Sequence, residues 1–207
     1  MHNIGYQGVF AAEAVGDLGL GQQAYLLHHD DLIAGRVNPL RHGILYADAL
    51  TTVSPTHARE ICTDEYGMGL QDSLRAREGD LTGILNGVDY SIWDPRHDPY
   101  LPRHFDPRHL AVKRELKRAF LARMGFTCGA QMPLAGIVSR LAAQKGIDLM
   151  FTALPRALER REWALIALGA GDEPYEQFFA ELADRFPGRV VFDRGYDDEL
   201  AHWIEAA

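Results

Sequence analysis

The chain has 207 residues, 47% hydrophobic and 24% charged, a composition that excludes disordered, collagen-like and coiled-coil proteins. Its formal net charge of −8 at pH 7 provides no electrostatic basis for binding a phosphate backbone, so we expect no nucleic-acid partner. No apolar run approaches the roughly 20 residues of a membrane span, and no signal peptide is apparent. We therefore expect an acidic, cytoplasmic protein without a membrane partner.

The first half of the chain predicts a strand, a helix and a second strand. Residues 48–54 (DALTTVS) are typical of a short strand, and a serine followed by proline predicts a helix over residues 54–61. Residues 81–85 (LTGIL) predict another strand, which ends in an Asn-Gly turn at 86–87. Strands separated by a helix favour parallel packing.

A proline-rich connector and a helix follow. Four prolines between residues 93 and 109 predict an extended segment, because each proline removes a hydrogen-bond donor and restricts the residue before it. Val112, Leu116 and Phe120 recur at four-residue spacing and predict an amphipathic helix over residues 111–124.

The second half predicts three strands that alternate with three helices. The strands are expected at residues 133–139, 163–169 and 189–193, and the helices at 147–160, 173–185 and 197–206. The first two strands are continuous apolar runs, typical of strands covered on both faces. This order is half of a doubly wound α/β domain, in which the carboxyl ends of the strands form one ligand-binding rim.

The strongest candidate binding site is the segment SRLAAQKG (139–146). Arg140 follows the end of a predicted strand, and Lys145 lies just before the next helix. Two cations at a helix N-terminus, together with loop N–H groups, can bind a phosphate or diphosphate. The segment matches neither GxxxxGK[ST] nor GxGxxG, and a solvated arginine and lysine beside a loop fit the spacing equally well.

Two further turns carry weaker signals. Gly169 and Gly171 in LGAGD would let the backbone approach a ligand, although such glycines more often serve packing. Asn86 and Asp89 in LNGVD could offer an amide and a carboxylate to a polar ligand, or form a structural Asx-turn.

The N-terminus carries polar and aromatic side chains of a type that suits sugars. His2 and Asn3 are followed by Tyr6 and Gln7, although a terminal histidine is usually just exposed. The sequence has no Ser-His-Asp order, so we expect no catalytic triad with a nucleophilic serine. It has no HExxH and no EF-hand pattern either, so we expect no bound metal.

Taken together, the motifs resemble the bacterial glycogen synthase and plant starch synthase family. The resemblance extends over the full chain in unbroken motif order and rests on MHNIGYQGVF (1–10), YADALTTVSPTHAREI (46–61), YGMGL (66–70), GILNGVDYSIWDP (83–95), PLAGIVSRLAAQKGIDL (133–149), LGAGD (168–172) and GYDDELAHWIEA (195–206). The combination of VSPTxAREI, LNGVDxxxWDP and VSRLxxQKG is highly specific.

The resemblance implies an α/β chain that is part of a GT-B fold, in which two Rossmann-like domains face each other. It implies transfer of glucose from ADP-glucose to the non-reducing end of an α-1,4-glucan, with retention of the anomeric configuration and without metal or cofactor. The partners would be a sugar nucleotide and the glucan. On this basis residues 1–130 would hold the end of the acceptor-side domain and the connector, and residues 131–207 the start of the nucleotide-sugar domain.

The resemblance also assigns roles to residues of the second half. Arg140 and Lys145 match the family pair that binds the diphosphate, where they would stabilise the charge on the leaving nucleotide. Gly169, Gly171 and Tyr196 would line the nucleotide-binding side of the cleft.

In the first half, His2 matches the active-site histidine near the transferred glucose, with Asn3 beside it. Asn86 matches an asparagine that lines the cleft, and Asp89 belongs to the same motif.

The family pattern extends beyond both ends of this chain, with K-x-G-G-L upstream and E-P-C-G-L downstream. We therefore expect both domains to be incomplete, the isolated chain to be inactive and exposed sheet edges to favour self-association. Two alternatives stay open: a catalytically dead remnant that binds nucleotide or glucan, and another GT-B transferase that uses a different sugar nucleotide.

Overall fold

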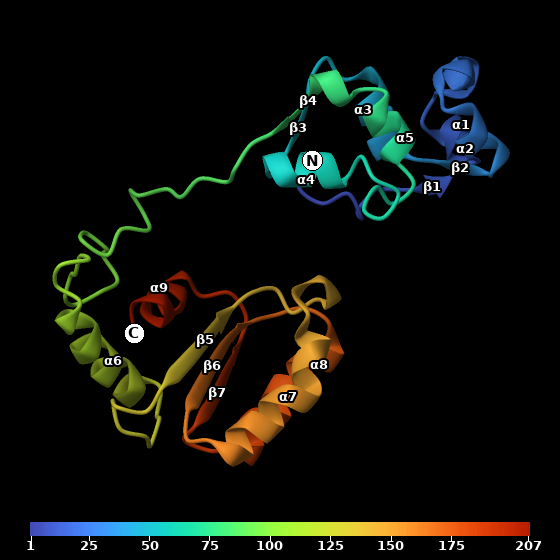
Figure 1. Ribbon diagram of the computed structural model, residues 1–207. Coiled ribbons are helices and arrows are strands. Elements are labelled where there is room, and N and C mark those ends of the chain that lie inside the picture. The colour runs from blue at the N-terminus through green and yellow to red at the C-terminus, as the bar shows by residue number, and fades with distance from the viewer. The chain divides into compact units, whose positions relative to one another are not determined.

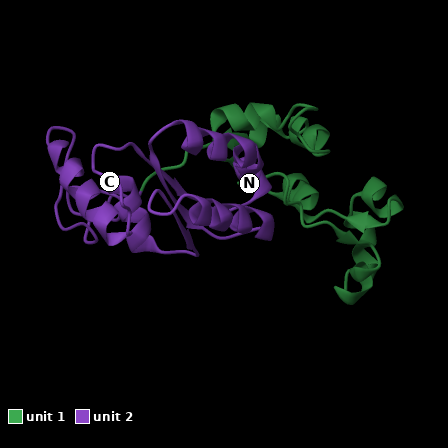
Figure 2. Cartoon of the chain, turned by 90° about the horizontal axis from the view of Figure 1, so that it is seen from below, with its two compact units in different colours: residues 1–88 green, residues 89–207 purple.

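The computed structural model describes residues 1–207, which form two compact units, residues 1–88 and residues 89–207 (Figure 1). Figure 2 colours these two units separately, and each has a hydrophobic core of its own. None of the helices has the length and apolar character needed to cross a membrane.

The first unit is built of short helices and strands. In chain order these are β1 (Phe10–Ala11), α1 (Ala14–Asp17), the 3-10 helix η1 (Gly21–Leu26), α2 (His29–Ile33), β2 (Arg36–Val37), α3 (Pro39–Tyr46), β3 (Leu50–Thr52), α4 (Pro55–Glu60), α5 (Gln71–Arg75), the 3-10 helix η2 (Glu78–Asp80) and β4 (Leu81–Gly83). β1 pairs antiparallel with β2, and β3 pairs parallel with β4. The predicted strand–helix–strand unit is thereby confirmed as β3, α4 and β4.

Local sequence explains where α4 begins and how β4 ends. The Ser54 hydroxyl accepts a hydrogen bond from the His57 amide at 2.9 Å, and Pro55 occupies the first helical position. The chain leaves β4 at Gly83 without a turn at residues 86–87, so the predicted Asn-Gly turn is wrong. An Asn-Gly pair forms a tight turn where the next strand folds back to pair with the one before it, and here β4 pairs only with β3.

The second unit contains the expected alternation of strands and helices. Its elements are α6 (Ala111–Arg123), β5 (Leu134–Val138), the 3-10 helix η3 (Ala143–Lys145), α7 (Ile147–Arg160), β6 (Ala164–Gly169), α8 (Glu173–Arg185), β7 (Val190–Arg194) and α9 (Asp198–Ala206). The sheet has the order β5-β6-β7 and all its strands are parallel. This arrangement is the first half of a doubly wound sheet, as predicted.

Helices cover both faces of this sheet (Figure 1). β6 is buried at all of its positions, and its residues alternate between two cores because side chains point to opposite faces of a strand. Ile166 packs with Phe120 of α6 and Trp203 of α9, whereas Leu165 packs with Leu158 of α7 and Phe179 of α8. The result is three layers, helix, sheet and helix.

The prediction that both apolar strands are covered on both faces is correct for β6 and wrong for β5. β5 lies at the edge of the sheet, and 43% of Val138 is exposed. An apolar run alone does not distinguish a central strand from an edge strand, because it reports burial of side chains and not pairing of the backbone.

The connector and α6 pack with the second unit. Residues 93–109 contain no helix or strand, as the prolines predict, and the Phe120 ring lies 6.4 Å from that of Trp203 on α9. The boundary between the two compact units therefore lies between Val88 and Asp89. The domain boundary expected at residues 130 and 131 concerns the two Rossmann-like domains and stays a prediction.

Candidate functional site

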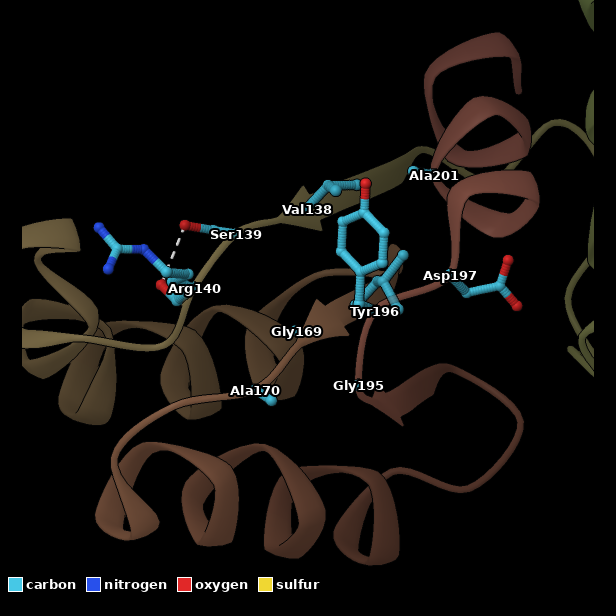
Figure 3. A pocket seen from close by; sticks show the side chains of 10 residues that line it. Val138, Ser139, Arg140, Gly169, Ala170, Gly195, Tyr196, Asp197 and Ala201 are labelled. Atoms are coloured by element: carbon cyan, nitrogen blue, oxygen red, sulfur yellow. Dashed lines mark hydrogen bonds between the residues drawn. The ribbon is translucent and has the colours of Figure 1, made fainter.

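The carboxyl ends of β5, β6 and β7 meet at a pocket of about 330 Å³ (Figure 3). The pocket is lined by Val138, Ser139, Arg140, Leu168, Gly169, Ala170, Gly195, Tyr196, Asp197 and Ala201. The rim predicted from the strand and helix order is thus present, and it brings Arg140, Gly169 and Tyr196 together.

The turns after β5 and β6 are joined by backbone hydrogen bonds. The Leu141 amide donates to the Ala170 carbonyl at 2.9 Å, and the Asp172 amide donates to the Leu141 carbonyl at 2.8 Å. A Cβ atom at Gly169 would lie 2.0 Å from the Ser139 carbonyl oxygen, and one at Gly171 would lie 2.0 Å from that of Leu141. These glycines therefore serve close packing between two turns, which is the structural alternative that the sequence left open.

Arg140 and Lys145 lie on the same loop between β5 and α7, and both side chains are exposed. Arg140 lines the pocket, and Figure 3 shows its guanidinium extending on the side away from the Tyr196 ring. Lys145 is the last residue of η3 and is not among the lining residues. Gly146, with φ +67°, is the residue just before α7 and has no side chain that could cap this 14-residue helix. The Leu149 amide donates to the Gly146 carbonyl at 3.1 Å, and the positive end of the helix dipole lies at this loop.

Tyr196 stands at the opposite side of the pocket (Figure 3). Its ring is 89% exposed, and a hydrogen bond with Asp198 raises the pKa of its hydroxyl. The preceding Gly195 has φ +143°, and its amide donates to the Gly169 carbonyl at 3.2 Å. The turn after β7 is thereby joined to the turn after β6.

A separate pocket of about 280 Å³ lies in the first unit, where β3 and β4 end. It is lined by Met1, His2, Thr51, Thr52, Val53, Ile84, Leu85, Asn86 and Gly87. His2 and Asn86, 84 positions apart in the sequence, thus share one pocket. The N-terminal amino group donates to the Thr51 carbonyl at 2.6 Å and the Thr52 hydroxyl donates to the Met1 carbonyl at 3.1 Å, which places His2 beside β3.

Asn3 and Asp89 are not among the residues that line these two pockets. The Asn3 side-chain oxygen accepts a hydrogen bond from the Gly5 amide at 2.9 Å. The Asp89 carboxylate accepts from the Ser91 hydroxyl at 2.6 Å and from the Ser91 amide at 2.9 Å, and these bonds lower its pKa. The structural Asx-turn is therefore the alternative that the structure favours for Asp89.

Glu176, a buried residue of α8, is not among the predicted site residues, and its carboxylate accepts a hydrogen bond from the Gly171 amide at 2.8 Å. One signal in the sequence was available. Glu176 precedes Phe179 and Leu182 at three-residue intervals, which places a carboxylate on the apolar face of the helix.

The fold and the pocket define the class of protein as an α/β protein with a Rossmann-like sheet that presents a ligand site at its strand ends. A sequence model of the starch synthase catalytic domain matches residues 1–76. The chain is 46% identical to a glycogen synthase of Anaeromyxobacter dehalogenans, covering 100% of this chain and 43% of that protein. It is 40% identical to a glycogen synthase of Roseobacter denitrificans, covering 99% of this chain and 42% of that protein.

The structure is similar to the catalytic domain of starch synthase IV from Arabidopsis thaliana, which was solved bound to ADP and acarbose. The two share 36% identity and superpose with a TM-score of 0.89, covering 100% of this chain and 43% of that one. The resemblance to the glycogen synthase and starch synthase family is thereby confirmed over the whole chain, as is the expectation of part of a GT-B fold. The chain spans somewhat under half the length of these relatives.

Proposed function

We propose that this chain is part of a cytoplasmic glucan synthase, which transfers glucose from ADP-glucose to the non-reducing end of an α-1,4-glucan with retention of the anomeric configuration. The observation that carries the proposal is the likeness over the entire chain to a starch synthase catalytic domain that binds ADP and acarbose. The glycogen synthases at 40% and 46% identity support the same reaction.

In this proposal the pocket of the second unit binds the nucleotide. Arg140 and Lys145 bind the diphosphate together with the N-terminal end of α7, because a guanidinium, an ammonium group and the positive end of a helix dipole each attract an anion. When the bond to glucose breaks, negative charge grows on the departing diphosphate. Fixed cations at that position stabilise the transition state more than the ground state.

The pocket of the first unit contributes the sugar side. His2 lies near the transferred glucose, with Asn3 as its neighbour, and the Asn86 amide can donate to and accept from sugar hydroxyls. Gly169 and Tyr196 line the nucleotide pocket, with Gly171 in the adjoining turn.

Titration of the 207-residue chain tests the nucleotide side directly. We expect ADP to bind in calorimetry, and Arg140→Ala and Lys145→Ala each to raise its Kd by at least about tenfold, since a hydrogen bond to a charged group is worth about 1.5–3 kcal/mol. Arg160→Ala is the matched control, because Arg160 lies on the exposed surface in the last turn of the same α7 helix. An unchanged Kd in both loop variants would contradict the diphosphate role.

A glucose-transfer assay with ADP-glucose and a maltooligosaccharide decides between synthase and remnant. In the whole protein we expect Lys145→Ala to raise the barrier to transfer by at least about 2 kcal/mol. Binding of ADP without transfer by the whole protein would favour a remnant that only binds. Competition by UDP-glucose stronger than that by ADP-glucose would favour another sugar-nucleotide transferase.

A further inference from the structure

Glu176 is a buried carboxylate in a helix face that is otherwise apolar. Its residue exposure is 7%, and it shares the inner face of α8 with Phe179 and Leu182. Burying a carboxylate costs several kcal/mol unless it is paired and hydrogen-bonded. A carboxylate is therefore tolerated in this position only if its two oxygens have partners.

The two carboxylate oxygens of Glu176 bind different segments. Oε1 accepts a hydrogen bond from the Gly171 amide at 2.8 Å, in the turn between β6 and α8. Oε2 forms an ion pair with the Arg194 guanidinium at 2.6 Å, at the end of β7. One side chain thus connects the ends of two neighbouring strands.

Both connected segments continue directly into the wall of the nucleotide pocket. Gly171 directly follows Gly169 and Ala170, and Arg194 directly precedes Gly195 and Tyr196. The pocket is lined by Gly169, Ala170, Gly195 and Tyr196 (Figure 3). The backbone hydrogen bonds of Leu141 also hold the turn after β6 against the turn after β5. Glu176 therefore adds a side-chain link to the backbone hydrogen bond from the Gly195 amide to the Gly169 carbonyl, so that two contacts hold the end of β7 to the turn after β6.

Resting on the nucleotide role proposed above, we propose that Glu176 is a positioning residue for the nucleotide: its carboxylate holds the β6 and β7 turns in the arrangement that binds ADP. Glu176 lies behind the pocket wall and reaches the ligand only through Gly171 and Arg194. A fixed backbone geometry next to a ligand raises affinity because the ordering is completed before binding.

Calorimetric titration of the 207-residue chain with ADP, well below the unfolding temperature, tests the proposal. We expect Glu176→Ala to raise the Kd for ADP by at least about tenfold, because both the Gly171 hydrogen bond and the Arg194 ion pair that hold the turns are lost. Glu176→Gln keeps an acceptor for Gly171 and loses the ion pair, so its Kd is expected to lie between those of Glu176→Ala and the wild type.

Two further variants serve as comparison and control. Arg194→Gln breaks only the ion pair, and we expect its Kd to match that of Glu176→Gln within about threefold. Glu181→Gln is the matched control, because Glu181 is an exposed acid on the same helix whose carboxylate accepts from Gln177 at 2.7 Å. We expect Glu181→Gln to bind ADP as the wild type does.

Amide hydrogen exchange measures the turns without any ligand. Exchange at Gly171 is expected to accelerate by at least about tenfold in Glu176→Ala and to stay near wild type in Glu176→Gln, which keeps the acceptor oxygen. A Kd for ADP in Glu176→Ala within twofold of the wild type would overturn the proposal, as would unchanged exchange at Gly171. If the wild-type chain binds no ADP, the nucleotide role itself fails, and the exchange data alone decide whether Glu176 holds the turns. If Glu176→Ala does not fold, the Kd values of Glu176→Gln and Arg194→Gln decide whether Glu176 positions the nucleotide.

Discussion

At the scale of single residues, Gly169 and Gly171 show how tightly the strand ends of the second unit are packed. The nearest neighbour of a Cβ atom at either position would be a backbone carbonyl oxygen of the adjoining turn. A flexible side chain could move aside, but the backbone of the β5 turn is held by hydrogen bonds. The Ser139 amide donates to the Leu168 carbonyl, and the Leu141 amide and carbonyl are both bonded to the turn after β6.

We expect Gly171→Ala to destabilise the second unit by about 1–3 kcal/mol, the typical cost of forcing an extra carbon into a packed site. Urea unfolding followed by tryptophan fluorescence measures the change. Gly129→Ala is the control, because Gly129 lies in the same unit and a Cβ atom added there would have no neighbour within 4 Å. Equal stability of the two variants would show that the turns can separate at little cost.

At the scale of elements, a buried histidine joins α9 to the connector. The His202 Nδ1 lies 2.6 Å from the Asp98 carboxylate, with side-chain exposures of 1% and 6%. The Trp93 ring stacks on the His202 ring with centroids 3.8 Å apart, and the Tyr100 ring lies at 4.9 Å. These contacts explain why a proline-rich segment without helix or strand packs with the second unit.

We expect His202→Ala to destabilise the second unit by about 3 kcal/mol, because it leaves a buried carboxylate without its partner and removes an aromatic contact. The fluorescence of Trp93 is expected to change at the same time, since its stacking partner is lost. Chemical denaturation gives the stability, and His97→Ala is the control because the His97 side chain is 78% exposed. A loss of stability no larger than that of His97→Ala would contradict this role.

The elements that periodicity predicts are the long ones, whereas the short elements β3, α4 and β4 are predicted from strand-forming residues and from the Ser54-Pro55 signal. β6, α7 and α8 have 6, 14 and 13 residues and a clear apolar pattern, so periodicity identifies them. The helices and strands between residues 10 and 47 are shorter and owe their form to packing within the first unit. Only α3 carried a usable signal, since the Asn38 side chain caps it and Pro39 is its first residue.

For the candidate site, sequence reasoning predicted the rim and missed the group that connects it. The rim follows from chain order, because parallel strands bring their carboxyl ends to one edge. The role of Glu176 depends on contacts with Gly171 and Arg194, five and eighteen positions away, and no local pattern reports which side chains meet across two turns.

At the scale of the whole chain, each sheet ends in strands with an unpaired edge. β5 and β7 are the edges of the larger sheet, and β3 and β4 pair only with each other. Beyond β4 the chain exposes a run of apolar side chains, with Ile84, Leu85 and Val88 each more than half exposed. Unpaired strand edges and contiguous apolar surface both favour association between copies of a chain.

We expect the 207-residue chain to associate reversibly, with a mean mass in sedimentation velocity that rises with concentration. Val138→Lys places a charge at the β5 edge and Thr82→Lys places one on β4, and a lysine at an edge opposes strand pairing. The variant that shifts the distribution toward monomer identifies the edge responsible, while circular dichroism verifies that both variants keep the wild-type fold. A wild-type chain that stays monomeric at all concentrations would contradict the expectation that these unpaired edges drive association, and repulsion at a net charge of −8 would then be tested by raising the salt concentration.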